Sequence, residues 1–210
     1  MEILQEISAL LQKGKVKNVE ELVQKALDEG VGAKQILEDG LLHGMGIIGD
    51  KFKNNEVFVP EVLVAARAMN VGSAVLKPYM AEAGVTAVGK VVLGTVKGDL
   101  HDIGKNLVRM MMEGRGLQVI DMGIDVSAEK FIETAKAENA QIIACSALLT
   151  TTMGEVKTVV EEAKAAGIRD KVKIMAGGAP VTEAFCKLVG VDLYAPDAAS
   201  AALEAVAACK

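Results

Sequence analysis

Apolar residues recur every three or four positions through the first 80 residues of the chain, and this spacing predicts amphipathic helices. The first helix would end at the break Lys13-Gly14-Lys15, and the second would begin with Asn18 as its cap and stop at Gly30. A third helix is expected over residues 33–53 and a fourth from Pro60, a residue suited to the first helical turn. Four helices joined by short loops predict an antiparallel bundle over residues 1–80.

From residue 90 the pattern changes to short apolar runs that alternate with amphipathic helices. This alternation predicts an α/β domain over residues 90–210, in which helices cover both faces of a parallel sheet. Five such units favour a flavodoxin-like (Rossmann-like) order of strands. Residues 81–89 are small and non-periodic, as expected for a linker or hinge. The strands are expected at residues 90–96, 117–122, 141–146, 172–176 and 191–194.

Two features of the third predicted helix and its following turn are unusual. The helix holds four glycines between residues 40 and 49, although each costs about 1 kcal/mol relative to alanine. They indicate close approach either of a neighbouring helix or of a bulky flat ligand. The turn holds Phe52 and Phe58, two of the four phenylalanines in the chain. These rings would either close the core of the bundle or form a surface that another group covers.

Composition narrows the functional classes. The formal net charge of −5 argues against a nucleic-acid surface, which needs a basic face. The residues near the amino terminus are acidic, which is not typical of a secretory signal. We also expect that no apolar run approaches the ~20 residues that span a bilayer. Both points favour a cytoplasmic protein. The three cysteines, Cys145, Cys186 and Cys209, lack CxxC spacing and are expected to be reduced and mostly buried.

Three loops at the carboxyl ends of the predicted strands carry candidate chemistry, and ligands of open α/β sheets bind at that edge. The first loop holds Asp99, His101 and Gly104, the third is the hydroxyl-rich run 146–152, and the fourth begins with Gly177-Gly178. An imidazole can ligate a metal, and a nearby carboxylate can fix its tautomer. Each pattern alone also fits an ordinary cap or turn. Their combination predicts one ligand site. The chain has no GxxxxGK[ST] motif, and its GxGxxG match at residues 44–49 lies inside a predicted helix rather than between a strand and a helix, so neither common nucleotide-binding loop is predicted.

These segments carry a resemblance to a known family. Asp99-Leu100-His101-Asp102-Ile103-Gly104, followed by Ser146-Ala147-Leu148 and Gly177-Gly178, resembles the motifs of corrinoid (cobalamin-binding) proteins of methyltransferase systems. It is also similar to the cobalamin-binding module of methionine synthase. The resemblance extends into the predicted bundle through residues 44–52 and 58–61, so it covers nearly the whole chain.

The resemblance implies a site with two sides. His101 would be the lower axial ligand of cobalt in base-off cobalamin, and Asp99 and Thr152 would form a proton relay. Phe52 and Val59 would cover the upper face that bears the methyl group, where the methionine synthase branch has leucine at the position of Val59 and serine at that of Thr152. The other cofactor contacts that it implies are Gly98, Leu100, Asp102, Ile103, Gly104, Ser146, Leu148, Thr150, Gly177, Gly178, Ala198, Phe58 and Glu38.

The function that the resemblance implies is a methyl carrier, one component of a multi-subunit methyltransferase. Its cobalamin would cycle between cob(I)alamin and methylcobalamin. A substrate-specific methyltransferase would supply the methyl group, a second would pass it to tetrahydrofolate or coenzyme M, and a reductive activator would rescue inactive cofactor. Methoxylated aromatics, methylamines, methanol and betaines remain open as donors. The alternatives are a cobalamin-dependent sensor or regulatory module, and the small cobalamin-binding part of a mutase.

Overall fold

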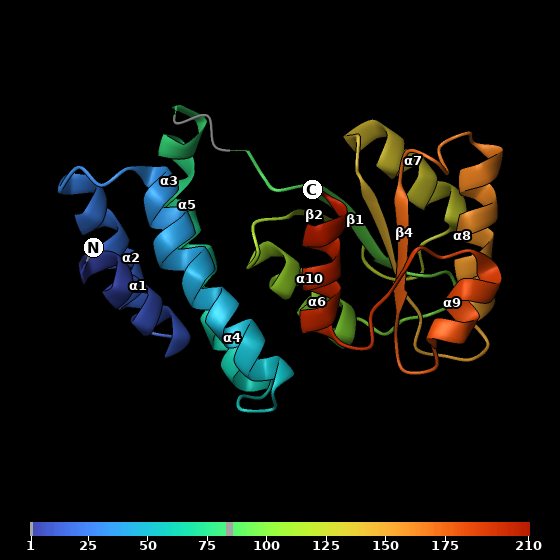
Figure 1. The fold of residues 1–210 in the computed structure, drawn as a ribbon, viewed down its shortest axis with the longest axis horizontal. Helices are drawn as coiled ribbons and strands as arrows, with labels where there is room; N and C mark the ends of the chain where they lie inside the picture. The colour runs from blue at the N-terminus through green and yellow to red at the C-terminus, as the bar shows by residue number, and fades with distance from the viewer. Residues whose placement is uncertain (1, 83–85) are drawn as a thin grey trace. The chain divides into compact units, whose positions relative to one another are not determined.

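The computed structural model of the chain describes residues 2–82 and 86–210 (Figure 1). The chain divides into two compact units, residues 1–86 with 114–116 and residues 87–113 with 117–210. Of the predicted linker over residues 81–89, residues 83–85 lie outside the described part of the chain.

The first unit is helical, and α2 packs along α5 while α1 contacts α2, η1 and α4. The prediction of a helical region before the sheet is confirmed. The third predicted helix runs without a break, but its middle is a π-helix, a rare form often found at functional sites. The elements are α1 (Glu2–Gln12), α2 (Val16–Asp28), α3 (Ala33–Gln35), η1 (Ile36–Leu42), α4 (His43–Lys53) and α5 (Val59–Glu82).

The predicted start of the second helix was wrong. α2 begins at Val16, so Asn18 lies inside its first turn, and the N-cap residue Lys15 makes no side-chain capping bond. The tight turn at Gly14, whose φ is +63°, already directs the chain into the helix. The predicted stop is confirmed, because Gly30 follows the C-cap residue with a φ of +83°.

The glycines of the third helical segment differ in their surroundings. A Cβ atom on Gly40 would lie 3.2 Å from Cγ2 of Ile7, and one on Gly44 would lie 3.0 Å from the carbonyl oxygen of Ser8. These two glycines therefore let α1 approach closely. A Cβ atom on Gly46 would meet nothing within 4 Å. Helix packing does not explain Gly46, and space for a ligand remains the hypothesis for it.

A matched pair of substitutions tests this distinction. We expect Gly44→Ala to lower the free energy of unfolding by about 1–3 kcal/mol, because the new methyl group meets the rigid backbone of Ser8. Gly46→Ala should instead raise it by about 1 kcal/mol through helix propensity alone. Denaturant titration of both variants measures the difference, and equal effects would contradict this account of the two glycines.

One helix among the described residues, Val59–Met80 within α5, is long and apolar enough to cross a membrane by length and composition, with a mean hydropathy of 1.3. This finding corrects the expectation that no apolar run approaches that length. Val62, Ala66 and Met69 of this helix are buried, and α5 packs along α2. Since the core helix of a bundle passes the same test, the finding is weak evidence for a membrane span.

The second unit is a five-stranded parallel sheet with the order β2-β1-β3-β4-β5, which confirms the flavodoxin-like prediction. Helices α6 and α10 pack together on one face, and α7, α8 and α9 cover the other (Figure 1). The strands are β1 (Lys90–Thr95), β2 (Gln118–Asp121), β3 (Ile142–Ser146), β4 (Lys173–Gly177) and β5 (Leu193–Tyr194). The helices are α6 (Ile103–Glu113), α7 (Ala128–Glu138), α8 (Met153–Ala165), α9 (Glu183–Val189) and α10 (Ala198–Ala208).

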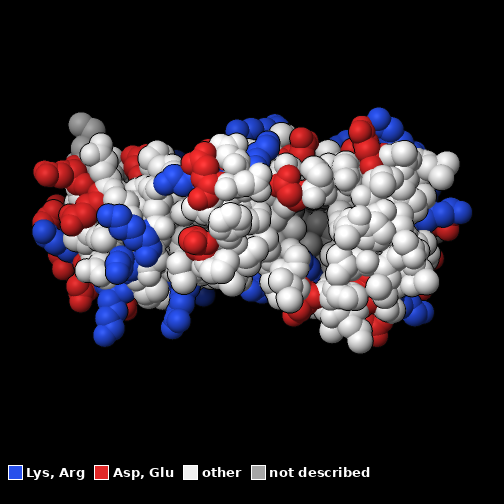
Figure 2. All heavy atoms as spheres, turned by 90° about the horizontal axis from the view of Figure 1, so that it is seen from below, with Lys and Arg blue, Asp and Glu red and all other residues white. Residues whose placement is uncertain are grey.

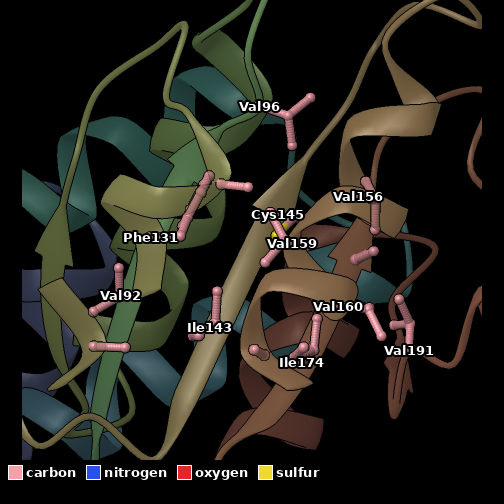
Figure 3. Close-up of a cluster of buried hydrophobic side chains, with 14 of the residues drawn as sticks. Val92, Val96, Phe131, Ile143, Cys145, Val156, Val159, Val160, Ile174 and Val191 are labelled. Carbon is pink, nitrogen blue, oxygen red and sulfur yellow. The ribbon is translucent and has the colours of Figure 1, made fainter. Parts of the chain in front are cut away.

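A buried aliphatic cluster joins the sheet to α7 and α8 (Figure 3). Phe131 and Val159 of these helices pack with Val92, Ile143 and Cys145 of the strands, and each is at most 3% exposed. Burial raises the pKa of the Cys145 thiol to about 12, so this cysteine is inert packing material. The rigid cluster supports the strand ends from which the candidate loops leave.

Candidate functional site

Three neighbouring strands end level with one another at the carboxyl edge of the sheet. Thr95 of β1 pairs with Ser146 of β3, and Ser146 pairs with Gly177 of β4. The loops that follow therefore leave the sheet at adjacent points, as predicted for a ligand site at this edge.

Asp99 is completely buried and joins the first loop to the third. Its Oδ1 accepts hydrogen bonds from Nδ1 of His101 at 2.6 Å and from the backbone N–H of His101 at 3.1 Å. Its Oδ2 accepts from the N–H groups of Leu148 and Leu149, at 2.7 and 3.2 Å, and from the Thr152 hydroxyl at 2.9 Å. The predicted neighbours Asp99, His101 and Thr152 are thus in direct contact.

The hydrogen bonds to Asp99 settle its charge. Burial alone raises the pKa of this carboxyl group, but the bonds from His101, Leu148 and Thr152 outweigh burial and hold the pKa well below its usual range. Asp99 is therefore a carboxylate at neutral pH. Because a carboxylate only accepts hydrogen bonds, Nδ1 of His101 must carry the ring proton.

In the neutral imidazole, Nε2 of His101 therefore carries the lone pair, and the side chain is 49% exposed. Its carbonyl oxygen accepts a bond of 2.8 Å from the hydroxyl of Thr95, which fixes the backbone as well as the ring. This arrangement, with one ring nitrogen held by a carboxylate and the other open, is typical of a metal-ligating histidine. No group of three His, Cys, Asp or Glu residues within residues 2–82 and 86–210 could hold a metal ion. A metal at Nε2 would need a group that brings its other ligands.

Large apolar side chains are exposed at this edge of the sheet, on the loops that follow β1, β2 and β3 and at the start of α6. Figure 2 shows the molecule turned by 90° from Figure 1, so that it is seen from below. In this view most of the surface of the sheet unit belongs to residues other than Lys, Arg, Asp and Glu. A broad apolar molecule could rest on these side chains and exclude water from Nε2. The exposed fractions are 67% for Leu100, 79% for Ile103, 41% for Ile124, 39% for Leu148 and 40% for Leu149.

The glycines of the loops have two different roles. A Cβ atom on Gly104 would meet nothing within 4 Å, so the space near His101 stays open there. A Cβ atom on Gly178, whose φ is +130°, would lie 1.9 Å from the carbonyl oxygen of Ala147. Gly177 also accepts a hydrogen bond of 3.1 Å from the N–H of Ala147. The Gly177-Gly178 turn, predicted to let a ligand approach the backbone, thus first lets the fourth loop pack on the third.

The remaining predicted contacts of the sheet unit lie near the same edge with different exposure. Asp102 and Thr150 are exposed, and Ser146 is half-buried. Ala198 is the first residue of α10 and only 7% exposed, which leaves little of its surface for a ligand. Sequence reasoning missed Asp125, which braces the first loop from the loop after β2. Its signal would have been an aspartate two positions after Gly123 in a predicted turn, where left-handed backbone is tolerated.

The two residues predicted to cover the upper face, and the predicted contacts Phe58 and Glu38, belong to the first unit. Phe58 is 65% exposed, so it does not close the core of the bundle. Phe52 and Val59 are half-buried. Glu38 lies in the π-helix η1, exposed and 3.9 Å from Lys34. The bundle unit thus has one exposed aromatic ring, Phe58, and a π-helical segment that carries Glu38. The role of each of these side chains toward a ligand stays a prediction.

Comparison with known proteins gives consistent matches to both units. One family described as a B12 binding domain matches residues 89–207, and a second with the same description matches residues 3–77. The chain is 44% identical over 205 residues to the dimethylamine corrinoid protein of Methanosarcina barkeri, covering 97% of this chain and 96% of that protein. It is also 44% identical over 180 residues to trimethylamine corrinoid protein 1 of Methanosarcina acetivorans, covering 85% of this chain and 83% of that protein.

A solved structure is similar over nearly the whole chain. A chain of the methanol:cobalamin methyltransferase complex of Methanosarcina barkeri superposes with a TM-score of 0.89 at 31% identity, covering 99% of this chain and 80% of that one. The similarity therefore includes the helical unit as well as the sheet unit.

Proposed function

Because the chain belongs to the cobalamin-binding corrinoid proteins of methyltransferase systems, we propose that it is a methyl carrier in which His101 is the lower axial ligand of cobalt. The observation that carries this proposal is the Asp99 carboxylate on Nδ1 of His101, which leaves Nε2 free for a metal. The bound cobalamin would supply a cobalt ion able to accept and release a methyl group.

The residues of the sheet unit fit such a cofactor. Among the described residues, His101 offers an imidazole nitrogen at this edge, and a corrin ring would bring further nitrogen ligands of its own. The exposed Leu100, Ile103 and Leu148 provide apolar surface for a broad macrocycle, and Gly104 leaves space beside them. The displaced base and its nucleotide tail would lie by Ser146, Thr150 and the turn at Gly178, with Ala198 as a further contact.

Asp99 and Thr152 would form the proton relay that responds when His101 binds or releases the metal. If Nε2 of His101 were not bound to a metal, it could take up a proton, and the Asp99 carboxylate would stabilise the imidazolium. The Thr152 hydroxyl has one proton, and both Oδ2 of Asp99 and the carbonyl oxygen of Leu149, at 3.0 Å, are within its reach. A turn of this hydroxyl between the two acceptors would accompany the change of charge on His101, which shares the Asp99 carboxylate.

We further propose that the bundle protects the methyl group. Phe52 and Val59 would cover the upper face of the corrin, with Phe58 and Glu38 as further contacts, and residues 81–89 would be the hinge that lets the bundle move aside. The similarity to corrinoid proteins over the helical unit supports this assignment. The open space at Gly46 is also consistent with a flat ligand near the third helical segment.

The relatives suggest the donor and the partners. They are named for dimethylamine and trimethylamine, and the similar structure is a complex for methanol. We propose that a methylamine or methanol is the donor and that a donor-specific methyltransferase docks on this chain. A second methyltransferase would pass the methyl group to tetrahydrofolate or coenzyme M, and a reductive activator would restore oxidised cofactor. All of these partners would meet the chain in the cytoplasm.

Reconstitution followed by label transfer tests the proposal. Apoprotein mixed with cobalamin should retain an equimolar amount through gel filtration. After reduction with titanium(III) citrate, the loaded protein should acquire the labelled methyl group of dimethylamine, trimethylamine or methanol when the matching methyltransferase is added. Failure to retain cobalamin would overturn the cofactor assignment. Retention without label transfer from any of the three donors would overturn the proposed donor class.

A further inference from the structure

Asp125 reaches the His101 loop from a different strand. It lies in the loop between β2 and α7, and its Oδ1 accepts a hydrogen bond of 2.7 Å from the N–H of Gly98. Its own N–H donates a bond of 3.0 Å to the carbonyl oxygen of Asp99. One residue thus holds the backbone on both sides of the segment Gly98-Asp99.

The loop that carries Asp125 is itself attached to β1. The N–H of Thr95 donates to the carbonyl oxygen of Gly123 at 3.0 Å, and the N–H of Val126 donates to that of Thr95 at 3.0 Å. Val96 and Val126 form an isolated parallel bridge beyond the regular ladder. Asp125 is therefore fixed to the same strand end from which the His101 loop departs.

The backbone of Asp125 is unusual. Its φ of +54° lies in the left-handed region, which costs roughly 1–2 kcal/mol for residues other than glycine and is least unfavourable for Asp and Asn. Gly98 is also left-handed, with a φ of +78°, and glycine supplies no side chain to restrain that turn. Strained conformations persist where surrounding contacts over-determine them, often at functional sites.

We propose that Asp125 is a positioning residue that holds Gly98-Asp99 in place and thereby sets the location of Nε2 of His101. The chain of contacts runs from Asp125 to the backbone of Asp99, and from the Asp99 carboxylate to Nδ1 of His101. Asp125 is exposed and adds little to the core, so its two bonds to the loop are its main contribution. The role toward cobalt rests on the proposed function, whereas the role toward the loop does not.

The first test uses apoprotein and amide hydrogen exchange. Asp125→Ala removes the acceptor of the Gly98 N–H, and we expect that amide to exchange at least about tenfold faster. Asp125→Asn keeps an Oδ1 acceptor and tolerates left-handed backbone, so exchange should stay near that of wild type. Asp170→Ala is the matched control, because Asp170 is an exposed turn aspartate before β4, at the opposite edge of the sheet.

The second test uses the cobalamin-loaded protein. At one fixed neutral pH, the absorption spectrum gives the fraction of cofactor ligated by histidine. We expect Asp125→Ala to weaken the ligation equilibrium about tenfold, with Asp125→Asn and Asp170→Ala close to wild type. Thermal unfolding of each variant separates this effect from loss of stability.

The outcomes separate the two ideas. If Asp125→Ala exchanges and ligates like Asp170→Ala, or if Asp125→Asn fails as Asp125→Ala does, the positioning role is overturned. If wild-type protein shows no histidine ligation, the proposed function fails, and the exchange of the Gly98 amide in apoprotein still decides whether Asp125 holds the loop.

Discussion

Replacement of His101 by alanine is expected to abolish ligation of cobalt by the protein. Nε2 of His101 is the one imidazole nitrogen that the sheet edge presents with its lone pair free, since Nδ1 is held by Asp99 at 2.6 Å. The apolar side chains around it remain in the variant, so cobalamin should still be retained through gel filtration, although less tightly. The histidine-bound absorption spectrum should be lost completely, and added imidazole should restore part of it.

The chain contains its own control for this experiment, because it has only two histidines. His43 lies at the start of α4, where Nδ1 is 3.3 Å from the hydroxyl oxygen of Ser8. His43→Ala should leave the cobalamin spectrum as in wild type. A spectrum that does not change in His101→Ala, or that changes equally in both variants, would contradict the assignment of His101 as ligand.

The sequence was sufficient to predict that the three candidate loops leave the same edge of the sheet, because strand periodicity decides that geometry. Apolar runs end at Thr95, Ser146 and Gly177, and parallel pairing brings such ends to one edge regardless of the loops between them. The contact between Asp99 and His101 is local, since the two residues are two positions apart. It could therefore be anticipated from the motif alone.

Features that depend on contacts between distant segments could not be predicted in this way. The need for glycine at 178 comes from the carbonyl oxygen of Ala147, a residue of another loop. The bracing role of Asp125 requires the register of β2 against β1, which periodicity does not reveal. Residues 36–42 form a π-helix, but their apolar residues are spaced as an α-helix would space them. The sequence pattern therefore could not distinguish a π-helix from an α-helix here.

Replacement of Asp99 by asparagine should strongly destabilise the sheet unit. One carboxylate oxygen faces two donors of His101, and the other faces three donors of Leu148, Leu149 and Thr152. The amide NH₂ group of asparagine must point at one of these sets, so donors would face donors in a fully buried place. We expect a loss of about 3 kcal/mol in the free energy of unfolding.

Asp102→Asn is the matched control for this substitution. Asp102 is exposed, and its Oδ2 accepts one bond of 3.2 Å from Asn106. Its replacement should change the free energy of unfolding by no more than about 0.5 kcal/mol. Urea titration measures both variants, and equal losses would contradict the central role of the buried carboxylate.

The dependence of the Asp99→Asn effect on pH provides a sharper test. The folded-state pKa of Asp99 is lowered from its ordinary value, so the carboxylate stabilises the fold at every pH above the unfolded pKa of about 3.9. This contribution is lost as the pH falls below that value and through the folded pKa. The stability difference between wild type and Asp99→Asn should therefore shrink as the pH falls below about 4. A difference that stays the same down to pH 3 would mean that the carboxylate charge is not what holds His101 and the third loop together.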